Sequence, residues 1–148
     1  MARGRFFSEF EVGQSFESSG RTVTEADVVN FAGLSGDFNP LHTDATFAER
    51  TPFGQRIAHG MLAASISTGQ GQTLGIFEGT TLALMSQTFD YKAPIFFGDT
   101  IRLKLTVDTV KASSKGGKGV VNFKSEIVKQ DDVVAVSGSW TVLFRDSK

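Results

Sequence analysis

The segment DFNPLH holds a carboxylate, Asp37, and an imidazole, His42, five residues apart. Histidine titrates near neutral pH, so a carboxylate and a histidine that converge on one water molecule form a general acid–base pair. Gly36 permits backbone conformations that other residues rarely adopt, and Pro40 fixes its own φ, so a loop bracketed by them can hold both side chains facing one point. The alternative is an ordinary turn in which Asp37 and Asn39 bond to the local backbone.

A second histidine, His59, directly precedes Gly60. It could be catalytic, or it could bind zinc together with Asp37 and His42, because two histidines and an aspartate are possible zinc ligands. The sequence has no closely spaced pair of ligands of the kind that usually marks such a site. We therefore expect His59 to be structural, and we predict neither a metal ion nor a cofactor.

Composition excludes several classes of protein. The chain has 148 residues, no cysteine and a net charge of −1. The absence of cysteine excludes disulfides, thiolate metal sites and a cysteine nucleophile. The balanced charge gives no general attraction to nucleic acid or to an anionic membrane, and no apolar run is long enough for a membrane helix. The first residues lack the features of a secretory signal. We expect one cytoplasmic domain over residues 1–148.

Two short helices are predicted in the first third of the chain. Residues 22–32 form the first, with Thr24 as its N-cap, Asp27 three positions on as a weak capping box, and Gly33 at its end. A loop from Leu34 to His42 follows. The second helix starts after Thr43 or Asp44 and runs through Ala48.

A longer helix is predicted from His59 to Thr73. This stretch is small and apolar, and Ala63, Ala64 and Gly69 would allow it to approach a sheet closely. We expect it to be the buried central helix of the domain.

The second half of the chain predicts consecutive strands. Residues 80–91, 100–110, 119–129 and 133–144 have strand character, and the stretches at 111–119 and 131–132 suit hairpin connections. The second strand alternates most clearly, with Ile101, Leu103, Leu105 and Val107 on one face. Strands in series plus one long early helix indicate an α+β fold, in which an antiparallel sheet covers the central helix.

The run FAGLSGDFNPLH at residues 31–42, with Ala48 beyond it, resembles the signature of the MaoC-like, R-specific enoyl-CoA hydratase family. IAHGML at 57–62 is similar to the segment that opens the family's central helix, and PIFFGDTI at 94–101 to its strand-turn-strand element. These two features also occur more widely among hot-dog proteins.

The resemblance implies a hot-dog fold, in which an antiparallel sheet wraps a long central helix and two such sheets usually pair in a homodimer or a higher homo-oligomer. It implies syn hydration of trans-2-enoyl thioesters to R-3-hydroxyacyl thioesters. Asp37 and His42 match the family's catalytic pair, and we expect both to hold the same water; which of them acts as the base is left open. Asn39 and Pro40 would support the loop.

Gly60 is the expected oxyanion donor, because its counterpart in the family lies at the N-terminus of the central helix. A free N–H there, together with the helix dipole, would stabilise negative charge on the thioester oxygen. The alternative is that Gly60 only permits a tight entry into the helix.

The substrate implied by the resemblance is an acyl-CoA or an acyl-carrier-protein thioester. Three other functions stay open: dehydration of 3-hydroxyacyl groups on a carrier protein, thioester hydrolysis, and a non-catalytic partner subunit. The positive charge of Lys111, Lys115 and Lys118, in a predicted hairpin, could attract the phosphates of CoA.

Overall fold

Four long strands build the sheet, and all four were predicted from hydrophobic patterning. The computed structural model describes residues 4–147. The clearest alternation is confirmed in β4 (Thr100–Ala112), whose four apolar inward side chains are at most 1% exposed. The other three long strands agree with prediction to within one residue at each end: β3 (Thr81–Tyr91), β5 (Lys118–Lys129) and β6 (Val134–Arg145).

The strands form one antiparallel sheet in the order β1-β4-β5-β6-β3. Two short strands, β1 (Ser15–Glu17) and β2 (Arg21–Thr22), both pair with β4, and a short 3-10 helix, η1 (Phe7–Glu9), precedes them. These elements of two or three residues were not predicted, because they are too short to show a periodic pattern of apolar residues. Strand β3 pairs only with β6 among the described strands, so it forms an edge of the sheet.

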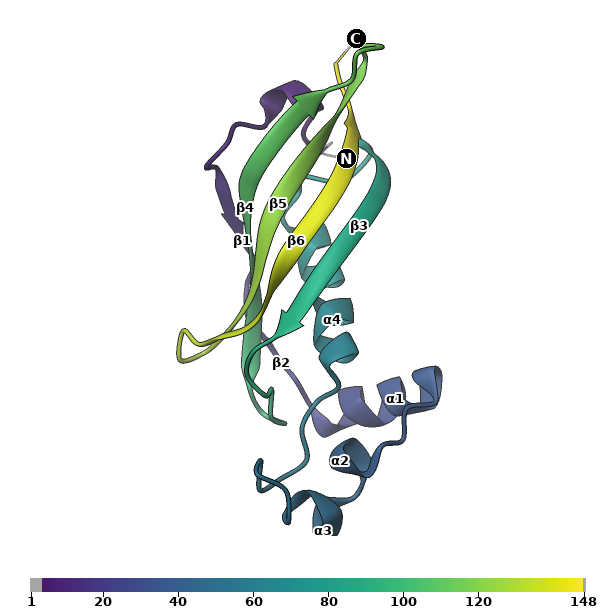
Figure 1. Cartoon of the computed structure of the whole chain (residues 1–148), viewed down its shortest axis with the longest axis vertical. Helices are drawn as coiled ribbons and strands as arrows, with labels where there is room; N and C mark the ends of the chain where they lie inside the picture. The colour runs from purple at the N-terminus through teal and green to yellow at the C-terminus, as the bar shows by residue number, and fades with distance from the viewer. Residues whose placement is uncertain (1–3, 148) are drawn as a thin grey trace.

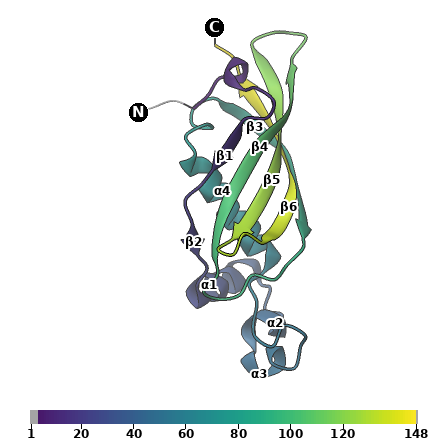
Figure 2. The same cartoon turned by 90° about the vertical axis from the view of Figure 1, so that its left-hand side faces the viewer.

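The predicted central helix is confirmed as α4 (Gly60–Thr73), which lies along one side of the curved sheet (Figures 1 and 2). Its residues Leu62, Ala63 and Ile66 belong to one apolar cluster, together with Ile101 from β4. A second cluster, rich in aromatic rings, fills the other end of the sheet around Phe123. The α+β arrangement of a helix wrapped by an antiparallel sheet is therefore as expected.

The close approach of α4 to the sheet occurs at Gly71 and not at the predicted Gly69. A Cβ atom at Gly71 would lie 2.9 Å from two ring carbons of Trp140, whereas Gly69 faces open space. Trp140 is buried and cannot easily move away. The prediction for Gly69 was wrong because the two glycines lie on different sides of the helix, and helix propensity cannot distinguish them.

Gly71→Ala should therefore destabilise the fold, while Gly69→Ala should stabilise it. In a helix interior, alanine in place of glycine raises the free energy of unfolding by up to about 1 kcal/mol. Overpacking against Trp140 lowers it by roughly 1–3 kcal/mol. We expect the free energy of unfolding to fall by about 1 kcal/mol for Gly71→Ala and to rise by a similar amount or less for the matched Gly69→Ala. Urea unfolding of both variants measures this, and equal effects would contradict the packing described.

The first helix beyond one end of the sheet has the predicted N-cap, but it begins and ends later than predicted. Helix α1 (Glu25–Ser35) is capped by Thr24 in a capping box with Asp27, so residues 22–24 lie outside it. It ends at Gly36, whose φ of 76° is left-handed, and not at Gly33. Gly36 is the residue that can leave the helix without strain.

Two single-turn helices follow α1. The sequence predicted a loop through His42, but Pro40–Thr43 forms a turn of helix, α2, with Pro40 at its first position. Proline has no N–H to lose there, which favours it at a helix start. The predicted second helix is α3 (Ala45–Ala48), capped by Asp44. Figure 1 places α1, α2 and α3 near the N-terminal end of α4.

The hairpin between β4 and β5 lies at the end of the sheet opposite to α2 and α3 (Figure 1). Its lysines therefore lie at the other end of the sheet from His42 within one chain, and the expectation that they attract the phosphates of CoA stays a prediction. No helix among residues 4–147 is both long and apolar enough to cross a membrane.

Candidate active site

Local hydrogen bonds fix the loop between α1 and α2. One carboxylate oxygen of Asp37 accepts the backbone N–H of Asn39 at 3.1 Å, and the side chain of Asn39 accepts the N–H of Leu41 at 3.0 Å. Asp37 therefore does bond to local backbone, as the ordinary-turn interpretation requires. Its second oxygen makes no hydrogen bond to the described residues, so the same turn orients the carboxylate and leaves part of it free.

His42 lies on α2 with one ring nitrogen engaged and the other available. Its Nδ1 is 2.7 Å from the backbone oxygen of Ile57. A carbonyl oxygen can only accept, so Nδ1 carries the hydrogen, and in the neutral ring Nε2 carries the lone pair. The backbone thus selects the tautomer in which Nε2 can remove a proton.

Asp37, His42 and His59 converge, although they come from different parts of the chain. Each offers a ligand-type atom, and these atoms all lie within 4.8 Å of one another. The two imidazole rings stack, with centroids 3.8 Å apart and planes 27° apart. Zinc accepts such donors, so this trio is the group among residues 4–147 that could hold a metal ion. One nitrogen of each ring already bonds to a backbone carbonyl oxygen, His42 Nδ1 to Ile57 and His59 Nε2 to Asp37, so each ring has one nitrogen left for another partner.

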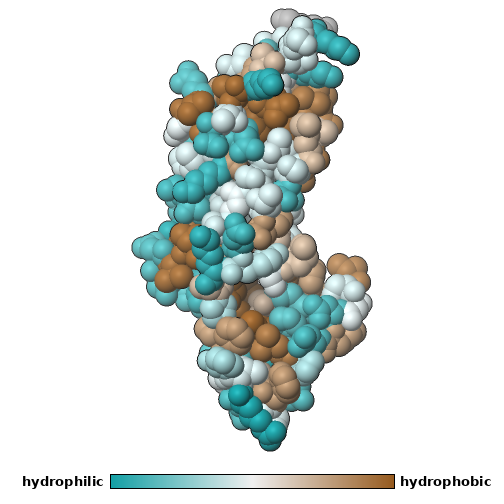
Figure 3. Space-filling model, in the orientation of Figure 1, coloured by the Kyte–Doolittle hydropathy of each residue, from teal (hydrophilic) through white to brown (hydrophobic). Residues whose placement is uncertain are grey.

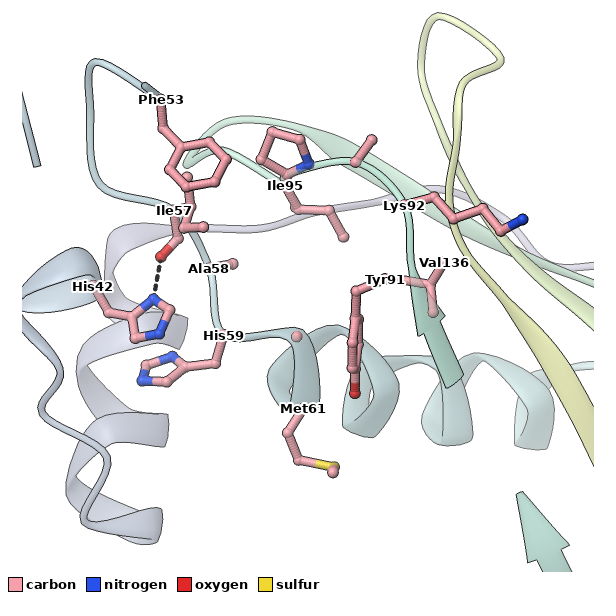
Figure 4. Close-up of a pocket in the computed structure, with 13 residues that line it drawn as sticks. His42, Phe53, Ile57, Ala58, His59, Met61, Tyr91, Lys92, Ile95 and Val136 are labelled. Carbon is pink, nitrogen blue, oxygen red and sulfur yellow. Dashed lines mark hydrogen bonds between the residues drawn. The ribbon is translucent and has the colours of Figure 1, made fainter. Parts of the chain in front are cut away.

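A cavity of about 540 Å³ opens between these residues and β3. His42, His59, Gly60 and Tyr91 line it, and Figure 4 shows the two imidazoles at one end and the Tyr91 ring beside the start of α4. Asp37 is exposed and is not among the residues that line the cavity. The rest of the wall is mostly apolar and includes Phe53, Ile57, Met61, Pro94, Ile95 and Val136. Such a wall suits an apolar ligand with one polar end.

Gly60 is the first residue of α4, as expected of an oxyanion donor. Its N–H makes no hydrogen bond to the described residues, and no side chain caps this helix. A Cβ atom here would lie 2.6–2.9 Å from the ring of Tyr91. Glycine is thus needed for close packing, and it also leaves a free N–H on the cavity wall. Burial raises the pKa of the Tyr91 phenol, so this group stays protonated at neutral pH.

A buried ion pair fixes the opposite wall and was missed in the sequence. Lys129 Nζ lies 2.8 Å from Asp99 and donates to the Pro94 carbonyl at 3.1 Å, while Asp99 accepts the N–H of Phe96 at 2.8 Å. Ala58, two residues before Gly60, donates its N–H to the carbonyl of Ile95 in this same segment, at 2.8 Å. The ion pair therefore supports the backbone on which the start of α4 rests. No local pattern in the sequence indicates that residues 99 and 129 meet.

Comparison with known proteins finds one matching family model and several similar enzymes. The family model described as "MaoC like domain" matches residues 8–130. A 3-hydroxybutyryl-CoA dehydratase from Methylorubrum extorquens is 41% identical over 103 residues, which cover 69% of this chain and 63% of that protein. An (R)-specific enoyl-CoA hydratase from Rhodospirillum rubrum is 36% identical over 139 residues, which cover 93% of this chain and 90% of that protein.

Solved structures agree on the fold. A monoamine oxidase regulatory protein from Archaeoglobus superposes with a TM-score of 0.91 at 34% identity, covering 100% of this chain and 99% of that one. A Mycobacterium tuberculosis protein with a double hot-dog fold superposes with a TM-score of 0.80 at 18% identity, covering 97% of this chain and 45% of that one. The domain therefore has the hot-dog fold. The chain therefore belongs to the MaoC-like dehydratase family and is a hydro-lyase of the hydratase–dehydratase class.

Proposed function

We propose that this chain catalyses the reversible syn hydration of trans-2-enoyl-CoA to R-3-hydroxyacyl-CoA, with Asp37 and His42 as the acid–base pair. The observation that carries the proposal is the convergence of Asp37 and His42, from one turn, beside the N-terminus of α4 and an apolar cavity. Relatives named for this reaction and for 3-hydroxybutyryl-CoA dehydration support the substrate class.

In this proposal the free oxygen of Asp37 and Nε2 of His42 hold one water molecule. The pair takes one proton from the water as its oxygen bonds to C3 of the enoyl group, and it returns one proton to C2. Because both groups lie on one side of the substrate, oxygen and hydrogen add to the same face. Asn39 and Pro40 act indirectly, since they fix the turn that orients Asp37 and begins α2.

Negative charge that develops on the thioester oxygen would be stabilised by the N–H of Gly60. The first N–H groups of a helix point outward without partners, and the helix dipole favours an anion there. Donors placed in advance at the position of a developing oxyanion are among the strongest contributions to catalysis. The acyl chain would then occupy the apolar part of the cavity.

The assay is the loss of the enoyl-thioester absorbance over a series of trans-2-enoyl-CoA chain lengths, with free thiol measured in parallel. The proposal expects hydration without thiol release. Thiol release without hydration would instead identify a thioesterase. Repeating the assay with enoyl groups on acyl carrier protein distinguishes the two carriers, and the carrier-protein dehydratase is favoured if only that substrate reacts.

We also propose that the enzyme is a homodimer joined through the edge strand β3. Leu82, Leu84 and Met85 on this strand are 52%, 51% and 57% exposed. Figure 3 shows hydrophobic surface along the margin of the sheet where β3 lies. A long apolar edge strand with unpaired backbone groups invites pairing with another strand. A second copy can supply it, because antiparallel pairing of β3 with itself is two-fold symmetric.

The double substitution Leu84→Asp/Met85→Asp should convert the dimer into monomers, because it places four carboxylates in the symmetric interface. Analytical ultracentrifugation at micromolar concentration measures the change. Val12→Asp is the matched control, since Val12 is equally apolar, 63% exposed and outside β3. The dimer proposal fails if the wild-type protein already sediments with the mass of one chain.

A further inference from the structure

His59 is buried between the two candidate catalytic residues. Its side chain is almost completely enclosed, with the residue 2% exposed. Its Nε2 lies 2.9 Å from the backbone oxygen of Asp37, and its ring stacks on that of His42. The edge of the Phe31 ring packs on it from α1, with centroids 5.0 Å apart and planes 62° apart. His59 thus contacts both ends of the catalytic turn (Figure 4 shows its ring against that of His42).

The hydrogen-bond pattern of His59 is unlike that of an ordinary core residue. Nε2 must carry the hydrogen, because the Asp37 carbonyl oxygen can only accept. Nδ1 is buried and has no partner among the described residues. A buried polar atom without a partner destabilises a fold and calls for a reason. An apolar ring would fill the space without this cost, but it could not donate to Asp37.

His59 is also the residue directly before the candidate oxyanion donor. It is the N-cap of α4, and its carbonyl oxygen accepts the N–H groups of Leu62 and Ala63. Its backbone therefore sets the direction in which the Gly60 N–H points, while its side chain touches Asp37 and His42. His59 therefore connects the candidate acid–base pair, Asp37 and His42, to the candidate oxyanion donor, Gly60.

We infer that His59 is a positioning residue for hydration. It holds the His42 ring and the backbone of Asp37 in fixed positions relative to the N–H of Gly60. This inference rests on the proposed function. The ring stack fixes the plane of His42, so that Nε2 faces the water, and the Nε2–H bond fixes the turn that carries the Asp37 carboxylate. Its role goes through these neighbours and needs no contact with the substrate.

Three variants separate the two contacts. His59→Gln keeps an amide N–H that can reach the Asp37 oxygen but removes the ring, His59→Phe keeps a ring for stacking but removes the donor, and His59→Ala removes both. Displacement of a catalytic group by about 1 Å can cost roughly 10²-fold in rate. We expect about that loss in kcat for crotonyl-CoA with His59→Ala, about tenfold for each of the others, and little change in KM.

The decisive comparison uses His42→Ala as a second background. A residue that acts by positioning His42 has little to position once that ring is gone, so adding His59→Gln, which removes only the stacked ring, to His42→Ala should lower kcat by less than twofold. Residues that act as a unit give non-additive losses of this kind. Ile66→Val, a buried change elsewhere on α4, controls for general destabilisation and should lower the melting temperature without lowering kcat.

The inference is overturned if His59→Phe and His59→Gln keep wild-type kcat, if they raise KM alone, or if the loss in kcat from His59→Gln is the same in both backgrounds. Should His59→Gln not fold, His59→Ala carries the comparison, and its loss in kcat should be smaller in the His42→Ala background. Failure of the proposed function would look different, because then His42→Ala itself would retain full turnover.

Discussion

Replacing His42 by alanine should lower kcat for hydration of crotonyl-CoA by roughly 10²–10⁴-fold, the usual contribution of one acid–base group. Asp37→Asn should cause a loss of the same order. Asparagine keeps an oxygen that can accept the N–H of Asn39, so the turn is preserved while the proton-transferring carboxylate is lost. Absorbance of the enoyl thioester, followed at saturating substrate, gives kcat for each variant.

His42→Asn is the matched control for the fold. Its side-chain amide can replace Nδ1 as donor to the carbonyl of Ile57, but it has no counterpart of Nε2. It should therefore melt close to the wild-type temperature and still lose as much activity as His42→Ala. Full turnover by His42→Asn or by Asp37→Asn would remove the acid–base assignment.

Asp99→Asn should lower the free energy of unfolding by about 3 kcal/mol at neutral pH, because breaking a buried pair leaves the partner charge uncompensated. Lys129 would remain enclosed, with the Pro94 carbonyl and the Phe96 ring as its contacts. Asp108→Asn, the same change at an exposed carboxylate, should alter stability by less than about 0.5 kcal/mol. Urea unfolding of the two variants measures the difference.

The contribution of the Asp99–Lys129 pair to the free energy of unfolding should decrease in acid. Burial by itself would raise the pKa of the Asp99 carboxyl, but hydrogen bonds from Gln130, Lys129 and the Phe96 N–H, with the Lys129 charge, outweigh it and lower the pKa below its usual 3.8. A lowered pKa in the folded state contributes stability above pH 3.8 that is lost as the pH falls through the folded value. The stability difference between wild type and Asp99→Asn should therefore shrink in acid, and a constant difference would contradict the pairing.

Asp99→Asn should also reduce hydration, although Asp99 is remote from the reacting atoms. Its pair with Lys129 fixes the segment whose Ile95 carbonyl holds Ala58, and Ala58 leads into Gly60. A shift of that backbone would move the proposed oxyanion donor, so activity and stability should fall together in this variant.

The regular parts of the fold could be predicted because they depend on local patterning. Alternation of apolar residues located β4, and Thr24 with Asp27 located the start of α1. The end of α1 was misjudged at Gly33, because only the backbone conformation reveals which of two glycines adopts a positive φ. The turn of helix at Pro40 was also missed, since four residues are too few to show a helical period.

The candidate site was predictable only where its residues are neighbours in the chain. Asp37 and His42 share one turn, so their spacing was informative. The stacking of His59 on His42 and the pairing of Lys129 with Asp99 join segments that are distant in sequence, and only tertiary structure brings them together. Tyr91 likewise reaches Gly60 because β3 ends beside the start of α4.

Hydration of crotonyl-CoA in D₂O, with the product analysed by NMR, tests most directly whether one turn delivers both water oxygen and proton to the same face of the substrate. The account predicts R-3-hydroxybutyryl-CoA with a single deuterium at C2, placed syn to the new oxygen. An S product, or a mixture of both C2 diastereomers, would contradict it.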